Sequence, residues 1–305
     1  MNRGRLLCPI AILILITFLV GCARGATPTG PASVEPISAS PTPTAPAVPA
    51  PPTPTASAVP APPTPTAPTV PASSSKDAAI TLTWFGQATF VLKMSTGLNA
   101  LLDPAGSGTG YNIPVQSGID LVTVSHEHSD HNAVSLASGS PLVLHGLAGN
   151  DWAKIDQTVK GVRVRTVPTF HDDAQGSQRG KNAVFVFKLE GLRLAHMGDL
   201  GHTLTPDQIT AIGPVDVILI PVGGFFTVDG KAAAQVVGQL NPKVVVPMHY
   251  KTPDLSASLA GRLSTEGDFV AALGNTAAVS QVGQTITIER SRLPAVRTIM
   301  LMKYK

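Results

Sequence analysis

The chain has 305 residues, of which 43% are hydrophobic and 13% charged, and its formal net charge at pH 7 is +3. Part of that small positive charge lies near the N-terminus. The rest of the chain is therefore close to neutral, and a clustered basic face for nucleic acid is not expected.

The N-terminal segment predicts an export signal over residues 1–21. Two arginines precede an apolar run at 6–20, which is too short and wrongly flanked for a membrane span. The run ends in Leu-Val-Gly-Cys, which resembles the lipobox of bacterial lipoproteins and implies cleavage before Cys22 and acylation of its sulfur. An uncleaved anchor helix is the alternative. We expect an extracytoplasmic protein of the cell envelope, held to a membrane by lipid, with no thiol left for a disulfide or a metal.

Residues 22–76 predict a disordered, lipid-anchored stalk. They are rich in Pro, Thr and Ala, and an eleven-residue repeat starts at positions 41, 52 and 63 as PTPTAPAVPAP, PTPTASAVPAP and PTPTAPTVPAS. Such a segment buries too little apolar surface to offset its ordering entropy, and its prolines favour extended polyproline II. A proline-rich ligand for a binding module is the alternative, although the basic flanking residues common in such ligands are missing.

Residues 77–305 are numerous enough for one domain with a sizeable core. Short apolar runs alternate there with helical patterns, which favours an α/β sandwich over an all-β barrel. We expect strands at 80–85, 89–94, 99–103, 120–125, 141–146, 162–168, 182–197 (a hairpin), 216–223, 243–248 and 284–289. We expect helices at 132–138, 206–212, 231–240 and 267–273, the last with Thr265 as a cap and Asp268 three residues on.

The motif SHEHSDH at 125–131 places three of the eight histidines of the chain within seven positions. Side chains two apart in an extended loop point the same way. His126 and His128 can therefore hold one metal ion, while Asp130 and His131 turn toward a second ion beside it. Chance production of this spacing in a chain so poor in histidine is rare, so a solvated polar loop is the weaker interpretation.

Polar residues able to bind metal also follow three other predicted strands. His171 follows 162–168, Asp199 follows the hairpin 182–197, and His249 follows 243–248. Each of these alone would more often be a core or surface residue or part of a turn. Loops at the carboxyl ends of strands gather ligands in α/β folds, so we expect these side chains to meet the SHEHSDH loop at one edge.

These motifs together resemble the metallo-β-lactamase superfamily. The matching stretches are SHEHSDH, PTFHDD (168–173), HMGDLGH (196–202) and PMHY (247–250). The likeness is closest to the branch of ascorbate 6-phosphate lactonase and N-acyl phosphatidylethanolamine phospholipase D, which shares openings like TWFGQA (83–88) and LLDP (101–104) and a loop like PVGGFFT (221–227). The resemblance implies an α/β fold that forms a four-layer αββα sandwich around two metal ions.

The resemblance also implies a set of ligands. His126, His128 and His171 would hold the first ion, Asp130, His131 and His249 the second, and Asp199 would bridge the two. Many relatives have histidine where this chain has Gln87, a position outside the ligand set, so this departure affects local contacts.

Two ions would supply a hydroxide nucleophile, because water bound to a divalent metal has its pKa lowered from about 16 toward 7. Asp130 would accept and later return the proton. Zinc suits imidazole and carboxylate ligands, and manganese or iron tolerate the same set. His202 could line the substrate cavity or orient a ligand, and Tyr250 could donate to a developing oxyanion.

The expected function is a metal-dependent hydrolase of a small ester, lactone or phosphodiester. One alternative is an exported β-lactamase, which Asp199 weakens because the established β-lactamases of this fold do not use that bridging aspartate. Another alternative is a non-catalytic binding or sensing module. Retention of all seven ligand types argues against it.

The lipid anchor gives the first testable prediction. Cys22→Ser removes the only sulfur that the predicted signal would present for acylation, so the protein should move from the membrane to the soluble fraction. Labelling with a radioactive fatty acid checks this directly, with the unsubstituted chain as the positive control. Equal labelling of the two proteins would contradict the lipoprotein interpretation.

Overall fold

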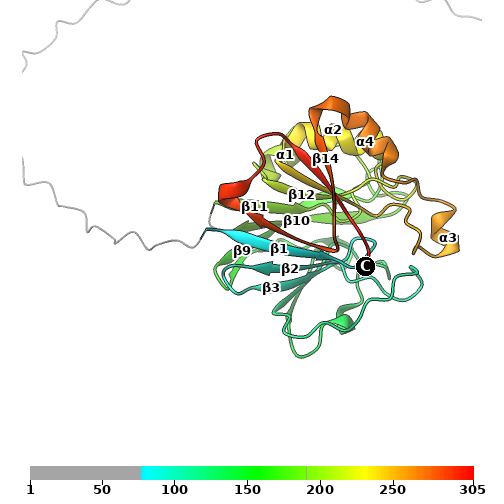
Figure 1. Cartoon of the computed structure of the whole chain (residues 1–305). Helices are drawn as coiled ribbons and strands as arrows, with labels where there is room; N and C mark the ends of the chain where they lie inside the picture. The colour runs from blue at the N-terminus through cyan, green and yellow to red at the C-terminus, as the bar shows by residue number, and fades with distance from the viewer. Residues whose placement is uncertain (1–76, 190) are drawn as a thin grey trace, which may run out of the picture. The chain divides into compact units, whose positions relative to one another are not determined.

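Two β-sheets form the part of the chain that the computed structural model describes, residues 77–189 and 191–305 (Figure 1). The predicted signal at 1–21, the lipid-bearing Cys22 and the stalk at 22–76 lie outside these residues and stay predictions. None of the helices in the described ranges is long and apolar enough to cross a membrane.

The first sheet has six strands, and burial alternates simply along one of them, β1 (Ala79–Trp84), whereas β4 (Leu121–Val124) is buried throughout. Its order is β15 (Thr285–Glu289), β1, β2 (Phe90–Met94), β3 (Asn99–Leu102), β4 and β5 (Leu142–His145). In β1, Ile80, Leu82 and Trp84 are buried and their neighbours are partly exposed. This is the period of two expected for a strand with one buried face. Strands β3, β4 and β5 run parallel.

The second sheet has eight strands and supplies most of the core. Its order is β14 (Ala278–Val282), β16 (Thr298–Met302), β13 (Val244–Met248), β12 (Val217–Pro221), β11 (Leu192–His196), β10 (Lys181–Leu189), β9 (Val162–Phe170) and β8 (Asp156–Val159). All residues of β12 and β13 are buried, as their unbroken apolar sequences predict for parallel strands covered on both faces. A separate two-stranded ribbon pairs β6 (Leu147–Ala148) with β7 (Asp151–Trp152).

Helices cover the outer face of the eight-stranded sheet. Figure 1 shows α1 (Pro206–Ile212), α2 (Gly230–Leu240) and α4 (Gly267–Leu273) on that side, and a short α3 (Ala257–Ala260) lies apart from them. Thr205 caps α1 with a full capping box, and Asp229 caps α2 by accepting from the Ala232 N–H. The N-cap of α4 is Glu266, whereas the predicted cap Thr265 accepts only weakly from the Gly267 N–H, at 3.4 Å.

The other outer face carries a thinner layer than expected. A cluster that includes Val91, Leu101 and Val122 packs there against the 3-10 turn η1 (Val134–Leu136), so the predicted helix at 132–138 is wrong. Ala133 offers no side-chain cap, and Ala137 is already extended and bridges to Gln116, which leaves no room for a longer helix. The α/β sandwich therefore keeps its four layers, with one of them reduced to a turn and loops.

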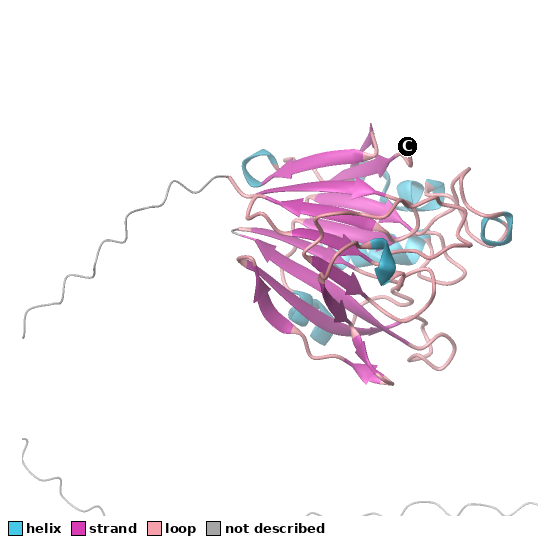
Figure 2. Cartoon of the chain, turned by 90° about the horizontal axis from the view of Figure 1, so that it is seen from below, coloured by secondary structure: helices cyan, strands magenta, loops and turns pink. Residues whose placement is uncertain are grey.

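Strand direction gathers the predicted ligands at one edge of the second sheet. Strands β9 and β11 both run antiparallel to β10, and β12 and β13 run parallel to β11. The carboxyl ends of β9, β11 and β13 consequently lie at the same edge. Figure 2 shows many loops gathered beside one end of the strands. This edge carries the residues described next.

Candidate metal centre

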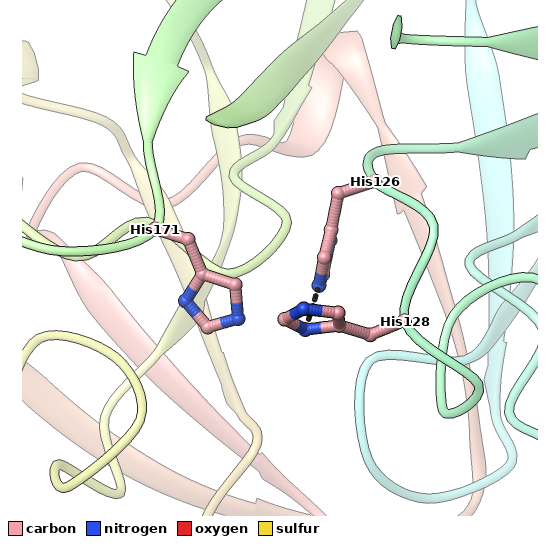
Figure 3. A group of neighbouring side chains, drawn as sticks. All are labelled: His126, His128 and His171. Carbon is pink, nitrogen blue, oxygen red and sulfur yellow. Dashed lines mark hydrogen bonds between the residues drawn. The ribbon is translucent and has the colours of Figure 1, made fainter. Parts of the chain in front are cut away.

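Three histidine rings face one another between the two sheets. His126 and His128 come from the loop after β4, and His171 follows β9 (Figure 3). The ring centroid of His126 lies 4.5 Å from that of His128 and 4.7 Å from that of His171. The ring centroids of His128 and His171 lie 5.0 Å apart. The three side chains can present ligand atoms to one ion.

A second group lies beside the first. Asp130, His131, Asp199 and His249 offer ligand atoms that all lie within 4.8 Å of one another. Oδ2 of Asp199 is 3.2 Å from Nε2 of His131 and 3.3 Å from Nε2 of His249. The same oxygen is 3.2 Å from Nε2 of His171, a member of the first group. The structure thus brings all seven predicted residues together and places Asp199 between the two groups.

Asp103 positions the SHEHSDH loop. It follows β3, is fully buried, and its Oδ1 accepts from the Ser125 N–H at 2.8 Å. Its Oδ2 lies 2.9 Å from Nδ1 of His131 and accepts from the Ser125 hydroxyl, which itself lies 3.0 Å from Nδ1 of His126. Asp103 therefore orients two predicted ligands through their outer nitrogens and leaves their inner nitrogens free for an ion. This role was not predicted, although Asp103 is the last residue of the strand expected at 99–103.

Asn182 fixes the loop that carries Asp199. Its Oδ1 accepts from the Asp199 N–H at 2.9 Å, and its amide donates to the carbonyl of Met197 at 2.9 Å. Gly198 lies between, with φ of 55°, and a Cβ on it would come within 2.3 Å of the Asn182 oxygen. Only glycine allows this turn to pack so closely, which explains the Gly-Asp pair in the sequence.

Opposite charges offset the cost of burying this centre. Burial would lower the pKa of His249, but Asp199 and Asp130 raise that pKa to about 9. Burial would raise the pKa of Asp199, but His131 and His249 hold that pKa well below the usual range. The ionised carboxylates favour positive charge in the centre, and a bound divalent cation would provide that charge.

Unpartnered polar atoms show that these residues fit a metal. Nε2 of His131 and Oδ1 of Asp199 are buried and have no hydrogen-bond partner in the described part of the chain. Such atoms cost roughly 1–3 kcal/mol each when they stay unpaired. Imidazole nitrogens and carboxylate oxygens are the donors that zinc takes in proteins.

Gln87 contacts the second group directly. Its side-chain Nε2 lies 2.7 Å from Nε2 of His249 and 3.2 Å from Oδ2 of Asp130, and its own Oε1 is buried without a partner among the described residues. The main chain of Gln87 is held as well, because its carbonyl accepts from the indole of Trp84 and from the His249 N–H. Gln87 stands where many relatives have histidine. This departure therefore affects contacts with two predicted ligands, Asp130 and His249.

The two predicted substrate residues do not line the cavity beside the centre. Tyr250 is buried and stacks on Trp84 with ring centroids 5.6 Å apart, next to a different cavity. Nε2 of His202 accepts from the Phe170 N–H at 3.1 Å, and its Nδ1 lies 2.8 Å from the Thr203 carbonyl. His202 thus ties down the residue before His171, which agrees with the ligand-orienting role and not with the cavity-lining one.

Known proteins are similar to this chain in sequence. Residues 81–249 match the family described as "Beta-lactamase superfamily domain". The chain is 31% identical to a UPF0173 metal-dependent hydrolase of Thermococcus kodakarensis over 195 residues, or 57% of this chain and 85% of the relative. It is 29% identical to another, from Carboxydothermus hydrogenoformans, over 228 residues, or 68% of this chain and 99% of the relative.

Solved structures agree on the fold. A Thermotoga maritima protein assigned to the Zn-dependent hydrolases of the metallo-β-lactamase superfamily has 38% identity and a TM-score of 0.57, covering 73% of this chain and 98% of that one. A Parabacteroides distasonis protein with 15% identity and a TM-score of 0.54, covering 74% of this chain and 94% of that one, is alike in fold alone. The expected fold class is confirmed.

The contacts of Gln87 predict a role in metal binding. Gln87→Ala removes an amide that touches Asp130 and His249, so affinity at the second group should fall by about 10- to 100-fold, the usual cost of losing a partner of the ligands. Competition with a chelating dye measures it. Gln284→Ala is a matched control, because Gln284 bonds to the carbonyl of Trp84 outside the centre. Equal affinities for Gln87→Ala and the unsubstituted protein would contradict this role.

Proposed function

Since the chain belongs to the metallo-β-lactamase superfamily and is a metal-dependent hydrolase, we propose that it hydrolyses a small ester, lactone or phosphodiester at two divalent ions. The observation that carries the proposal is the position of Asp199. Its Oδ2 lies within 3.3 Å of histidines from both ligand groups, so one carboxylate can serve two neighbouring ions. A single-ion site would not need the second group.

The seven residues define what each ion would contact. His126, His128 and His171 would hold the first, and Asp130, His131 and His249 the second, with Asp199 shared. When bound, two divalent ions supply a hydroxide at neutral pH and a Lewis acid for the substrate oxygen. The mixture of imidazoles and carboxylates favours zinc, and manganese or iron accept the same donors.

Asp130 is placed for proton transfer. It lines the cavity next to the centre, and its side chain is 28% exposed, whereas that of Asp199 is 3% exposed. Its Oδ2 receives the Gln87 amide at 3.2 Å, which fixes the carboxylate while part of it still faces the cavity. Asp130 can therefore take a proton from the attacking water and return it to the leaving group.

The cavity supports a small substrate. It has a volume of about 500 Å³ and is lined by His128, Asp130, His171, Asp199 and His249 on one side. This size suits a small ester, lactone or phosphodiester. A β-lactam is the second candidate substrate, and the activity screen described below decides between them.

The location of the enzyme is a further part of the proposal. The lipobox-like sequence before Cys22 and the proline-rich repeats support an extracytoplasmic lipoprotein, anchored to a membrane and presented on a stalk. Its partners would then be the membrane, through lipid, and a small-molecule substrate, with no nucleic acid.

An activity screen tests the reaction class. The purified protein, supplied with zinc or with manganese, should hydrolyse at least one lactone, carboxylic ester or phosphodiester and leave β-lactams intact. Asp130→Asn should reduce that activity by about 10² to 10⁴, the range for a lost general acid–base group. Hydrolysis of β-lactams alone, or full activity in Asp130→Asn, would overturn the proposed mechanism.

Metal content tests the shared carboxylate. The parent should bind close to two ions per chain, because seven donors form two groups. Asp199→Ala should lose metal from both groups, whereas His249→Ala should mainly empty the second and His171→Ala the first. Plasma emission spectroscopy on metal-replete preparations gives the ratios. A parent with one ion or none, or an unaltered Asp199→Ala variant, would argue against a dinuclear centre.

A further inference from the structure

The loop between β9 and β10, residues 171–180, is held rigid by one buried carboxylate. Oδ1 of Asp172 accepts from the N–H groups of Ala174 and Gly176, at 2.9 and 2.8 Å. Its Oδ2 accepts from those of Gln178 and Arg179, at 3.0 and 2.7 Å. These four backbone donors satisfy both oxygens of the buried carboxylate. The loop is thereby tied to the residue that follows His171.

Arg179 leaves this loop toward the cavity of the metal centre. Its guanidinium carbon lies 5.8 Å from the ring centroids of both Phe225 and Phe226, within the range of a cation–π contact. The ion pairs made by arginines in residues 77–189 and 191–305 join Arg163 to Asp156 and Arg292 to Glu289, and none involves Arg179. Its charge is therefore held in place by neighbours that do not neutralise it.

The walls of the cavity leave that charge unopposed. Apart from Asp130 and Asp199, which face the histidines, Arg179 is the only acidic or basic residue other than histidine among the lining residues in the described ranges. The rest of the lining includes uncharged polar residues and two apolar ones, namely Ser107, Thr109, Gln178, Ser258, Phe226 and Leu259. A neutral ligand would leave the guanidinium without a counter-charge, whereas an anionic ligand would supply it.

We propose that Arg179 forms an anion subsite, so that the substrate is a small ester or lactone carrying a carboxylate or phosphate group apart from the bond that is cleaved. This rests on the proposed function and adds the charge of the substrate to it. The guanidinium offers a planar fork of donors that matches both oxyanions, and the rings of Phe225 and Phe226 lie within cation–π range of it. The serine and threonine hydroxyls of the cavity would contact the uncharged part of the substrate.

Binding of paired probes to the zinc-loaded full-length protein tests the subsite. Butyrate carries one carboxylate, and glutarate and 4-phosphonobutyrate add a second carboxylate or a phosphonate at the far end of a similar chain. Calorimetry should show that one or both dianions bind at least about 10-fold more tightly than butyrate, since the second anionic group gains the charged guanidinium as a hydrogen-bond partner. Which dianion gains more distinguishes a carboxylate from a phosphate substrate.

Substitution of Arg179 should abolish this gain and leave the affinity for butyrate unchanged. Arg179→Gln should bring the ratio of the affinity for a dianion to that for butyrate below about 2-fold. Arg179→Lys should keep part of the gain in affinity because the positive charge remains. Arg262→Ala is the matched control: Arg262 lies 5.0 Å from the Phe225 ring and does not line the cavity, so its ratio should equal that of the parent. Zinc content and circular dichroism establish that each variant is folded.

Two results would overturn the subsite: no gain for either dianion in the parent, or the same gain in Arg179→Gln as in the parent. The ratio is measured without turnover, so it is independent of the activity screen. A protein that shows the Arg179-dependent gain but hydrolyses no ester, lactone or phosphodiester would refute the proposed function and keep the subsite.

Discussion

One buried oxygen, Oδ2 of Asp199, is the point at which the structure converges. Nitrogens of His131, His171 and His249 lie within 3.3 Å of it, and Nε2 of His126 lies 3.9 Å away. An ionised carboxylate is stable in such a place only when positive charge surrounds it. The arrangement of the surrounding loops follows from that requirement, because each must deliver an imidazole to the same oxygen.

The polar groups around the histidines act as a rigid frame. Asp103, Ser125 and Asn182 are all buried, and each bonds to the loop of a predicted ligand. Several backbones in this frame are strained: Gln87, Asp103 and His249 have φ of 48°, 41° and 52°, a region that residues other than glycine rarely occupy. Strain of this kind costs about 1–3 kcal/mol per residue and persists only where surrounding contacts enforce it. Such strain beside the candidate ligands is typical of a functional site.

The gathering of the candidate ligands could be predicted from the sequence because its signals are local. The spacing of SHEHSDH and the position of His171, Asp199 and His249 after apolar strands depend on neighbours along the chain. Strands β6, β7, β8, β14 and β16 were not predicted. Strands β8 and β14 have largely exposed residues without a clear alternation, so only their pairing partners define them.

The substrate side of the site could not be predicted in the same way. Tyr250 follows His249 in the sequence, but successive side chains point in opposite directions, and its ring packs on Trp84 instead. Arg179 lies in a polar loop with no periodicity, and its position depends on the burial of Asp172, which a sequence does not reveal. Gln87 lies outside the predicted ligand set, and its contacts with Asp130 and His249 arise from tertiary packing.

The centre also joins the two sheets. His126, His128, Asp130 and His131 follow β4 of the six-stranded sheet, whereas His171, Asp199 and His249 follow strands of the eight-stranded sheet. The ligand groups are therefore complete only after the sheets have packed face to face, and an unfolded chain cannot offer them together. A metal ion held by residues from both sheets binds the native state selectively and raises the free energy of unfolding by mass action. Metal supply would in this way control how long the folded enzyme survives, as well as whether it is active.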